Sequence, residues 1–237
     1  MANERIEVFQ SAPERAFIQA VVDKRVADAM RLASPLPHGV NTVSPSGETA
    51  LLYAVQANDV PMVEALLAAG ADPNGGPDRA PLHPATRDPS GRLLTILLRA
   101  GADPSRTYNT ETPLWEAALI DERGNAAKLI AAKAPLDKGN GNNLSPAMIA
   151  ASAGHWIMAT QLIEAGASPW HTPANGQTLA NLAAFDRLRP DTEEGQARDR
   201  VIEKFRGFGY PWPPPKPPEV RALIAAGRWP PPAGQPH

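Results

Sequence analysis

The chain has 237 residues, of which 43% are hydrophobic and 5% aromatic, and its formal net charge at pH 7 is -2. This charge gives no electrostatic footprint for binding nucleic acid or an anionic membrane. The chain has no cysteine, which excludes a disulfide framework and a thiolate zinc site. We see neither a secretory signal nor a run near the roughly 18 apolar residues that a membrane span needs, so we expect a cytoplasmic protein.

The first 39 residues predict a degenerate N-terminal capping repeat. Residues 15–20 and 26–32 have the apolar spacing of two short helices. Polar residues nearby suit the end of a stack, where one face of the terminal repeat meets water.

Residues 40–211 contain a repeated pattern with a spacing of 31 to 33 residues. One block, Thr49-Ala-Leu-Leu-Tyr-Ala54, returns from residues 80, 112, 145 and 178. A second block, Leu66-Leu-Ala-Ala-Gly-Ala-Asp-Pro-Asn74, returns from residues 97, 129 and 162. A fixed period of this length indicates a stack of supersecondary units rather than one globular core.

Each copy predicts two short helices joined by a turn. Thr49 stands where a helix N-cap hydroxyl is wanted, and Pro61 suits the first turn of the second helix. Gly70 suits a left-handed C-cap. Lys133 replaces this glycine in the third copy, so we expect a strained or reshaped corner there.

The paired blocks resemble the ankyrin repeat, whose signature is Thr-Pro-Leu-His-x-Ala followed by Leu-Leu-x-x-Gly-Ala-Asp. The resemblance covers four copies and a looser fifth. It implies an all-α fold, an ankyrin-repeat solenoid of about five to six helix-turn-helix repeats with β-hairpin-like tips. It also implies structural roles for His83 and His155, and hairpin-bracing roles for Asp72 and Asp103.

The last repeat and the C-terminus depart from the pattern. Residues 188–196 read as an insertion between the two helices, with the second helix resuming near Arg198. Such insertions map to loops on one face, often a binding face. Residues 212–237 form a Pro-rich strap and a capping helix: 212–218 predict extended polyproline II, and 219–227 resemble a lone second helix of a repeat.

No pattern in the chain points to catalysis. A zinc-binding His-Glu-x-x-His helix, a Gly-x-Ser-x-Gly elbow and a phosphate loop are all missing from the sequence. We therefore expect a non-enzyme with no catalytic residue, no cofactor and no metal. An enzyme or a ligand-regulated protein stays a remote alternative, because a fold does not exclude a function.

The resemblance implies a partner-binding surface at the hairpin tips and at the exposed ends of the first helices. A solvated helix end does not need Leu-Ile or Phe, and aromatic residues are common interface anchors. In the alternative interpretation, Trp115, Leu119 and Ile120 pack into neighbouring repeats. The insertion and the strap are further candidate surfaces. The candidate residues are Glu48, Gln56, Arg79, Arg87, Asp88, Tyr108, Glu111, Trp115, Leu119, Ile120, Asn142, Ser152, Asn175, Phe185 and Asp186.

Resemblance to small bacterial ankyrin proteins that stand alone implies a binding module for one protein partner. The sharper hypothesis is an inhibitor or immunity protein, which covers the active site of a toxin or lytic enzyme and is a monomer when free. We expect no nucleic acid or membrane partner. A host-directed effector or a scaffold protein is the alternative.

Overall fold

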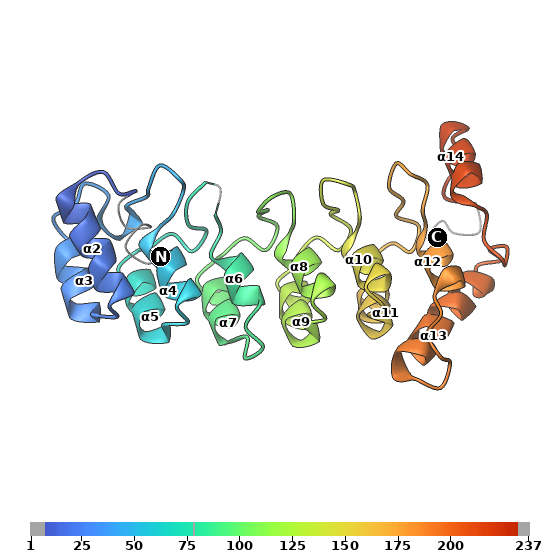
Figure 1. The fold of residues 1–237 in the computed structure, drawn as a ribbon, viewed down its shortest axis with the longest axis horizontal. Coiled ribbons are helices and arrows are strands. Elements are labelled where there is room, and N and C mark those ends of the chain that lie inside the picture. The colour runs from blue at the N-terminus through green and yellow to red at the C-terminus, as the bar shows by residue number, and fades with distance from the viewer. Residues whose placement is uncertain (1–7, 78, 232–237) are drawn as a thin grey trace. The chain divides into compact units, whose positions relative to one another are not determined.

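The computed structural model describes residues 8–231 except residue 78, and within these residues it forms 13 α-helices, one short 3-10 helix and no strand (Figure 1). The chain divides into two compact units, Met1–Tyr108 and Asn109–His237. The first unit contains α2 (Ala12–Val22), α3 (Val26–Ala33), η1 (Gly39–Asn41), α4 (Ala50–Gln56), α5 (Val60–Ala68), α6 (Leu82–Thr86) and α7 (Arg92–Arg99). The second contains α8 (Pro113–Leu119), α9 (Arg123–Ala131), α10 (Pro146–Ser152), α11 (Trp156–Glu164), α12 (Leu179–Phe185), α13 (Glu193–Gly207) and α14 (Pro217–Ala225).

The helices pair in chain order, from α2 with α3 to α12 with α13, which confirms the predicted helical repeats. Hydroxyl caps begin four of the first helices, because Thr49, Thr112, Ser145 and Thr178 each accept a hydrogen bond from the backbone N–H three residues later. Each cap satisfies a backbone donor that the helix leaves unpaired and typically contributes about 1 kcal/mol.

The core of each unit lies between the two layers of helices. The leucine that opens each copy of the Leu66–Asn74 block is fully buried there. These leucines are Leu66, Leu97, Leu129 and Leu162. Alanines such as Ala54 and Ala150 are equally buried on the facing first helices, and their small size lets the layers approach closely. A single helix pair could not enclose these residues, so each repeat depends on its neighbour.

Left-handed glycines end the second helices, as the sequence predicts. Gly70, Gly101 and Gly166 have φ of 88°, 92° and 106°. Lys133 takes the same conformation with φ 66°, and its N–H donates to Ile130 O at 2.9 Å, matching the bond from Gly70 N to Leu67 O. Of the two expected outcomes, a strained or a reshaped corner, the structure has the first: the corner keeps its shape and Lys133 takes the strained conformation.

Long loops connect one repeat to the next and project to one side in each unit (Figure 1). Isolated bridges join Val43 to Thr49 and Gly76 to Arg79, which gives the tips a hairpin-like form without named strands among the described residues. Asp72 and Asp103 brace their loops by accepting backbone N–H groups two residues ahead, each at 2.8 Å. These aspartates thus have the local role that the sequence predicts.

In three places an Asn or Asp side chain of one repeat accepts a hydrogen bond from a backbone N–H of the next repeat. The bonds run from Asp72 N to Asn41 Oδ1 at 2.7 Å, from Asp103 N to Asn74 Oδ1 at 2.8 Å and from Ser168 N to Asp137 Oδ1 at 2.9 Å. In each bond the earlier repeat supplies the side chain and the later repeat supplies only backbone.

The insertion in the last repeat differs from its prediction. Helix α13 begins at Glu193 rather than near Arg198, so only residues 186–192 form a loop and the rest extends the helix. Thr192 caps the helix by accepting from Gly195 N at 3.0 Å, and two glutamates occupy the first turn, where the helix dipole favours negative charge.

The proline-rich strap is also shorter than predicted. The extended part covers residues 211–216 and contains a cis peptide bond between Trp212 and Pro213, which departs from polyproline II. Helix α14 begins at Pro217, before the expected start at 219, because prolines are tolerated in a first helical turn. The Glu219 carboxylate completes this N-terminus by accepting from Lys216 N at 2.8 Å.

An aromatic cluster packs the C-terminal segment onto the last repeat. The Trp170 ring lies 5.1 to 6.0 Å, centroid to centroid, from the rings of Phe205, Phe208, Tyr210 and Trp229. Trp170 is thus the centre of the packing between the last repeat and the C-terminal segment. Across the described residues, no helix has the length and apolar character needed to cross a membrane.

Candidate protein-binding surface

Three of the predicted tip residues meet in the first unit. Arg79 Nη1 lies 3.5 Å from Glu48 Oε1, and its guanidinium carbon lies 6.0 Å from the centre of the Tyr108 ring. Glu48 is buried and accepts a hydrogen bond from the Tyr53 hydroxyl at 2.8 Å. Glu48 therefore holds Arg79, which lies over the Tyr108 ring, and the side chains of Arg79 and Tyr108 stay partly exposed.

Three other predicted residues of the first unit line one shallow depression. Gln56 at the end of α4 and Arg87 and Asp88 after α6 surround a volume of about 300 Å³, with Leu93 among the other lining residues. Arg87 and Asp88 are 31 and 32 positions after Gln56, so they hold about the same position in the next repeat. The structure brings these equivalent positions together.

The second unit presents apolar side chains at the C-terminal ends of its first helices. We call Leu119, Ile120 and Phe185 the apolar rim; they are 38%, 42% and 73% exposed. Helix α10 lies beside both α8 and α12, so the exposed Ser152 at its end falls between them. Leu119 and Ile120 are thus separated from Phe185 by one repeat, and each offers an exposed apolar side chain of the kind that anchors interfaces.

Trp115 does not belong to this exposed set. Its side chain is buried, and its indole N–H donates to Leu144 O at 2.9 Å in the next repeat. The packing interpretation therefore holds for Trp115, whereas Leu119 and Ile120 lie at the surface.

The remaining tip residues lie at the other ends of the first helices. Asn142 and Asn175 are exposed on the long loops before α10 and α12, and Glu111 is half-buried before α8. A seven-residue helix is about 10 Å long. The tips and the apolar rim are thus separated by about the length of one first helix.

Phe185 adjoins a loop that is held by several hydrogen bonds. Asp186 accepts from Trp156 Nε1 at 2.6 Å and from Leu188 N at 2.7 Å. The buried Arg198 donates to Leu188 O at 2.8 Å. Residues 186–192 are therefore braced from α11 and α13, and Asp186 serves this bracing.

Sequence reasoning missed the bracing role of Arg198, since an arginine in a helix usually reads as solvated. A charged side chain is buried only where it has hydrogen-bond partners, and the partners of Arg198 are backbone carbonyls, which every residue has. Its burial can therefore be recognised only in the folded structure. No signal in the linear pattern connects Arg198 with residues 10 and 12 positions earlier.

His83, His171 and the buried phenol of Tyr210 contact other parts of the protein. His83 Nε2 lies 3.2 Å from Arg106 O and His171 Nε2 lies 2.9 Å from Asn143 O, so each contacts a backbone carbonyl of another loop. Burial raises the pKa of Tyr210 to about 12. Among the described residues, no group of three or more His, Cys, Asp or Glu side chains is arranged to hold a metal.

The helix pairs, left-handed corners and hairpin-like loops give the chain an ankyrin-repeat fold. The ankyrin-repeat family model matches residues 46–75. No curated protein matches the chain. A crystal structure of an ankyrin repeat domain from Acinetobacter baumannii AYE is similar over 78% of this chain and 97% of its own, with a TM-score of 0.66 and 23% sequence identity. Ankyrin repeats indicate a protein–protein interaction module, typically without catalytic activity.

Proposed function

We propose that the chain is an inhibitor or immunity protein that binds one toxin or lytic enzyme and covers its active site. The observation that carries this proposal is the position of Phe185, which is 73% exposed beside a loop held by Asp186 and Arg198. We further propose that the free protein is a cytoplasmic monomer.

Occlusion of a cleft requires a projecting group that loses little freedom on binding. A loop that is already ordered avoids much of the entropic cost of association. An aromatic side chain supplies a large apolar surface with few rotatable bonds, which is why aromatics dominate binding hot spots. Phe185 combines both properties, and Leu119 and Ile120 supply further exposed apolar side chains at the end of α8, two repeats earlier.

The first experiment is affinity capture with tagged protein from cells that carry its gene, followed by mass spectrometry. A single stoichiometric partner with hydrolase activity, inhibited at a 1:1 ratio, supports the proposal. Several weak partners without inhibition favour a scaffold and contradict it.

A variant then tests the role of Phe185. We expect Phe185→Ala to weaken inhibition by about 2 kcal/mol, or roughly 30-fold, because truncated hot-spot aromatics typically have this effect. Val43→Ala is the matched control, since Val43 is also an exposed hydrophobic residue but belongs to the first unit and is not a residue of the apolar rim. Equal inhibition by both variants contradicts the proposed site.

A further inference from the structure

Helix α14 has the sequence of a repeat's second helix. Residues 220–227 read Val-Arg-Ala-Leu-Ile-Ala-Ala-Gly, and residues 63–70 in and after α5 read Val-Glu-Ala-Leu-Leu-Ala-Ala-Gly. The two segments also end alike. Gly227 has φ 66°, and its N–H donates to Ile224 O at 3.0 Å, as Gly70 N donates to Leu67 O.

Among the described residues, no first helix accompanies α14. Instead it is seated on the long loop before α12, at the level of the loops of its own unit (Figure 1). Arg221 Nη1 donates to Asn175 O at 2.7 Å, and Val220 is fully buried. Gly176 permits this close approach, because a Cβ there would clash with Pro217 O.

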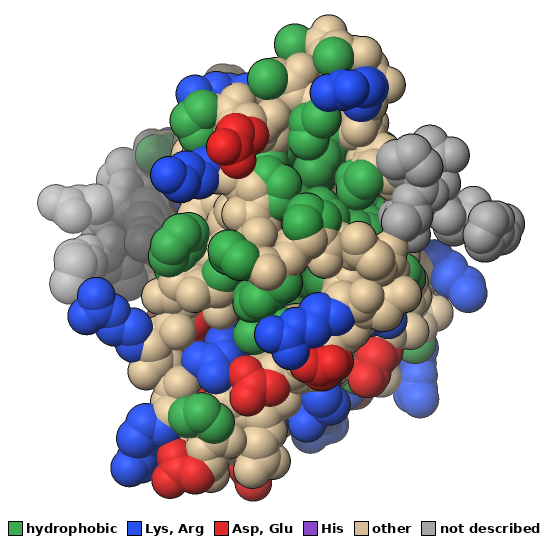
Figure 2. All heavy atoms as spheres, turned by 90° about the vertical axis from the view of Figure 1, so that its right-hand side faces the viewer, with side chains coloured by type: hydrophobic (Ala, Val, Ile, Leu, Met, Phe, Trp, Pro, Cys, Tyr) green, Lys and Arg blue, Asp and Glu red, His purple; other side chains and the backbone are tan. Residues whose placement is uncertain are grey.

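This seating leaves one side of α14 uncovered. Ile224 is 42% exposed, whereas its counterparts in the stacked second helices are half-buried or buried. These counterparts are Leu67, Leu98, Ile130 and Ile163. Figure 2 views this end of the second unit and shows hydrophobic side chains gathered over its middle and upper part, with Lys and Arg nearby.

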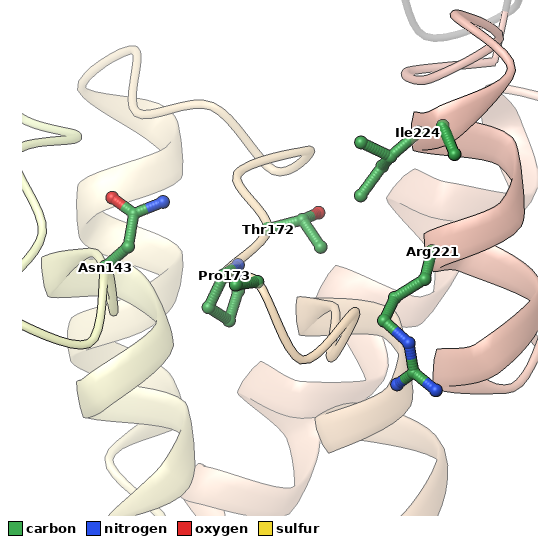
Figure 3. Close-up of a pocket in the computed structure, with 7 residues that line it drawn as sticks. Asn143, Thr172, Pro173, Arg221 and Ile224 are labelled. Carbon is green, nitrogen blue, oxygen red and sulfur yellow. The ribbon is translucent and has the colours of Figure 1, made fainter.

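A groove of about 470 Å³ runs between α14 and the long loops (Figure 3). Ile224 and Ala225 form one wall, Pro173 and Ala174 belong to the opposite loop, and Asn143 lies farther along. Ile224 projects from α14 toward the loop that carries Thr172 and Pro173. The groove thus has an apolar centre with amide and hydroxyl groups at its margin.

The charge of the groove is one-sided. Arg221 is the one charged residue among the described residues that line it, and no carboxylate lines it. One guanidinium N–H of Arg221 is used by Asn175 O, and a guanidinium carries five donors in total. The remaining donors suit a carboxylate, which binds arginine better than a neutral acceptor does.

We infer that this groove binds an amphipathic helix of a partner protein, with an apolar residue against Ile224 and Pro173 and a carboxylate on Arg221. The occupant follows from the chain itself, because α5, which has nearly the same sequence, packs against the first helix α4, whereas α14 has no such helix beside it among the described residues. A helix laid into an apolar groove is a common mode of peptide recognition. This site is distinct from the apolar rim, and it needs no toxin or enzyme as partner.

The test is selection of a phage-displayed library of random 16-residue peptides on the full chain. We expect enriched peptides with apolar residues three or four positions apart and a nearby Asp or Glu. Binding should fall at least about tenfold for Ile224→Glu and for Ala225→Trp, which fills the groove. Ala222→Trp is the matched control, because Ala222 is exposed on the same helix but does not line the groove.

A second comparison needs no change in the protein. Replacing the conserved acid of an enriched peptide by its amide should weaken binding about five- to tenfold, as expected for loss of a charge-assisted bond. The proposal is overturned if no peptide is enriched on the wild type over Ala225→Trp. It is equally overturned if the enriched peptides lack helical spacing, or bind Ile224→Glu as well as the wild type.

Discussion

Replacing Lys133 by glycine should stabilise the second unit. Lys133 has φ 66°, in the region where three equivalent positions have glycine. A non-glycine residue in this conformation costs about 1–2 kcal/mol. Glycine also loses more conformational freedom on folding than lysine does. This loss lowers the free energy of unfolding by about 0.5–1 kcal/mol and offsets part of the gain. The net expectation is a free energy of unfolding higher by about 0.5–1 kcal/mol, or a Tm higher by about 2–4 °C.

The side chain contributes little to this balance. Lys133 is exposed and makes no ion pair or side-chain hydrogen bond among the described residues. Lys133→Ala is therefore the control, because it removes the same side chain but keeps the Cβ that causes the strain. We expect Lys133→Ala to have the stability of the wild type.

Urea titration followed by tryptophan fluorescence is a suitable assay. All five tryptophans lie at positions after 108, so the signal reports the second unit. The reciprocal change, Gly166→Ala, should lower stability by about 1 kcal/mol, since φ is 106° there and a Cβ would make only ordinary contact with Leu136. Lys133→Gly with the same or lower stability than Lys133→Ala would refute the reasoning.

Three further predictions concern other parts of the molecule. Tyr210→Phe should change stability at pH 7 by no more than about 1 kcal/mol, because, among the described residues, the buried hydroxyl makes no hydrogen bond of good geometry and has only the polar side chain of Thr178 near it. Between pH 10 and 12 the free energy of unfolding of the wild type should fall by up to about 2.7 kcal/mol relative to this variant. The reason is that the pKa of the phenol is 10.0 in the unfolded chain and about 12 in the folded one. Urea titrations across this pH range measure the difference. Gly176→Ala should displace α14 and lower stability by about 2 kcal/mol, because the new Cβ clashes with Pro217 O and φ is 79° at this position. Limited proteolysis near α14 should then become faster, and unchanged cleavage would contradict the close approach. Leu119→Asp with Ile120→Asp should keep the helical circular dichroism and the stability within about 0.5 kcal/mol, as for surface positions, and an unfolded double variant would place both residues in the core.

The repeated local signals made most of the fold predictable. Thr49 and Gly70 each act within one turn of helix, so the sequence pattern contains the cause of the helix start and the corner. The start of α13 was missed because the repeat period suggested a later helix, although Thr192 followed by two glutamates is itself a start signal.

The candidate surface was less predictable than the fold. The period placed Trp115 and Leu119 on the same helix, but burial depends on the next repeat, whose Leu144 carbonyl accepts the Trp115 N–H. Glu48 was missed as a buried residue for the same reason, because its partner Arg79 is in the following repeat. Contacts between repeats are long-range pairings, and a single sequence carries no direct record of them.

The Asx bonds between repeats bear on how such a chain can change in length. The donor is always a backbone N–H, which every non-proline residue has, and the acceptor is a side chain at one fixed slot. A duplicated or deleted repeat would therefore find its junction already compatible with either neighbour. For this bond, gene segments of one period could be gained or lost without a complementary mutation in the neighbouring repeat.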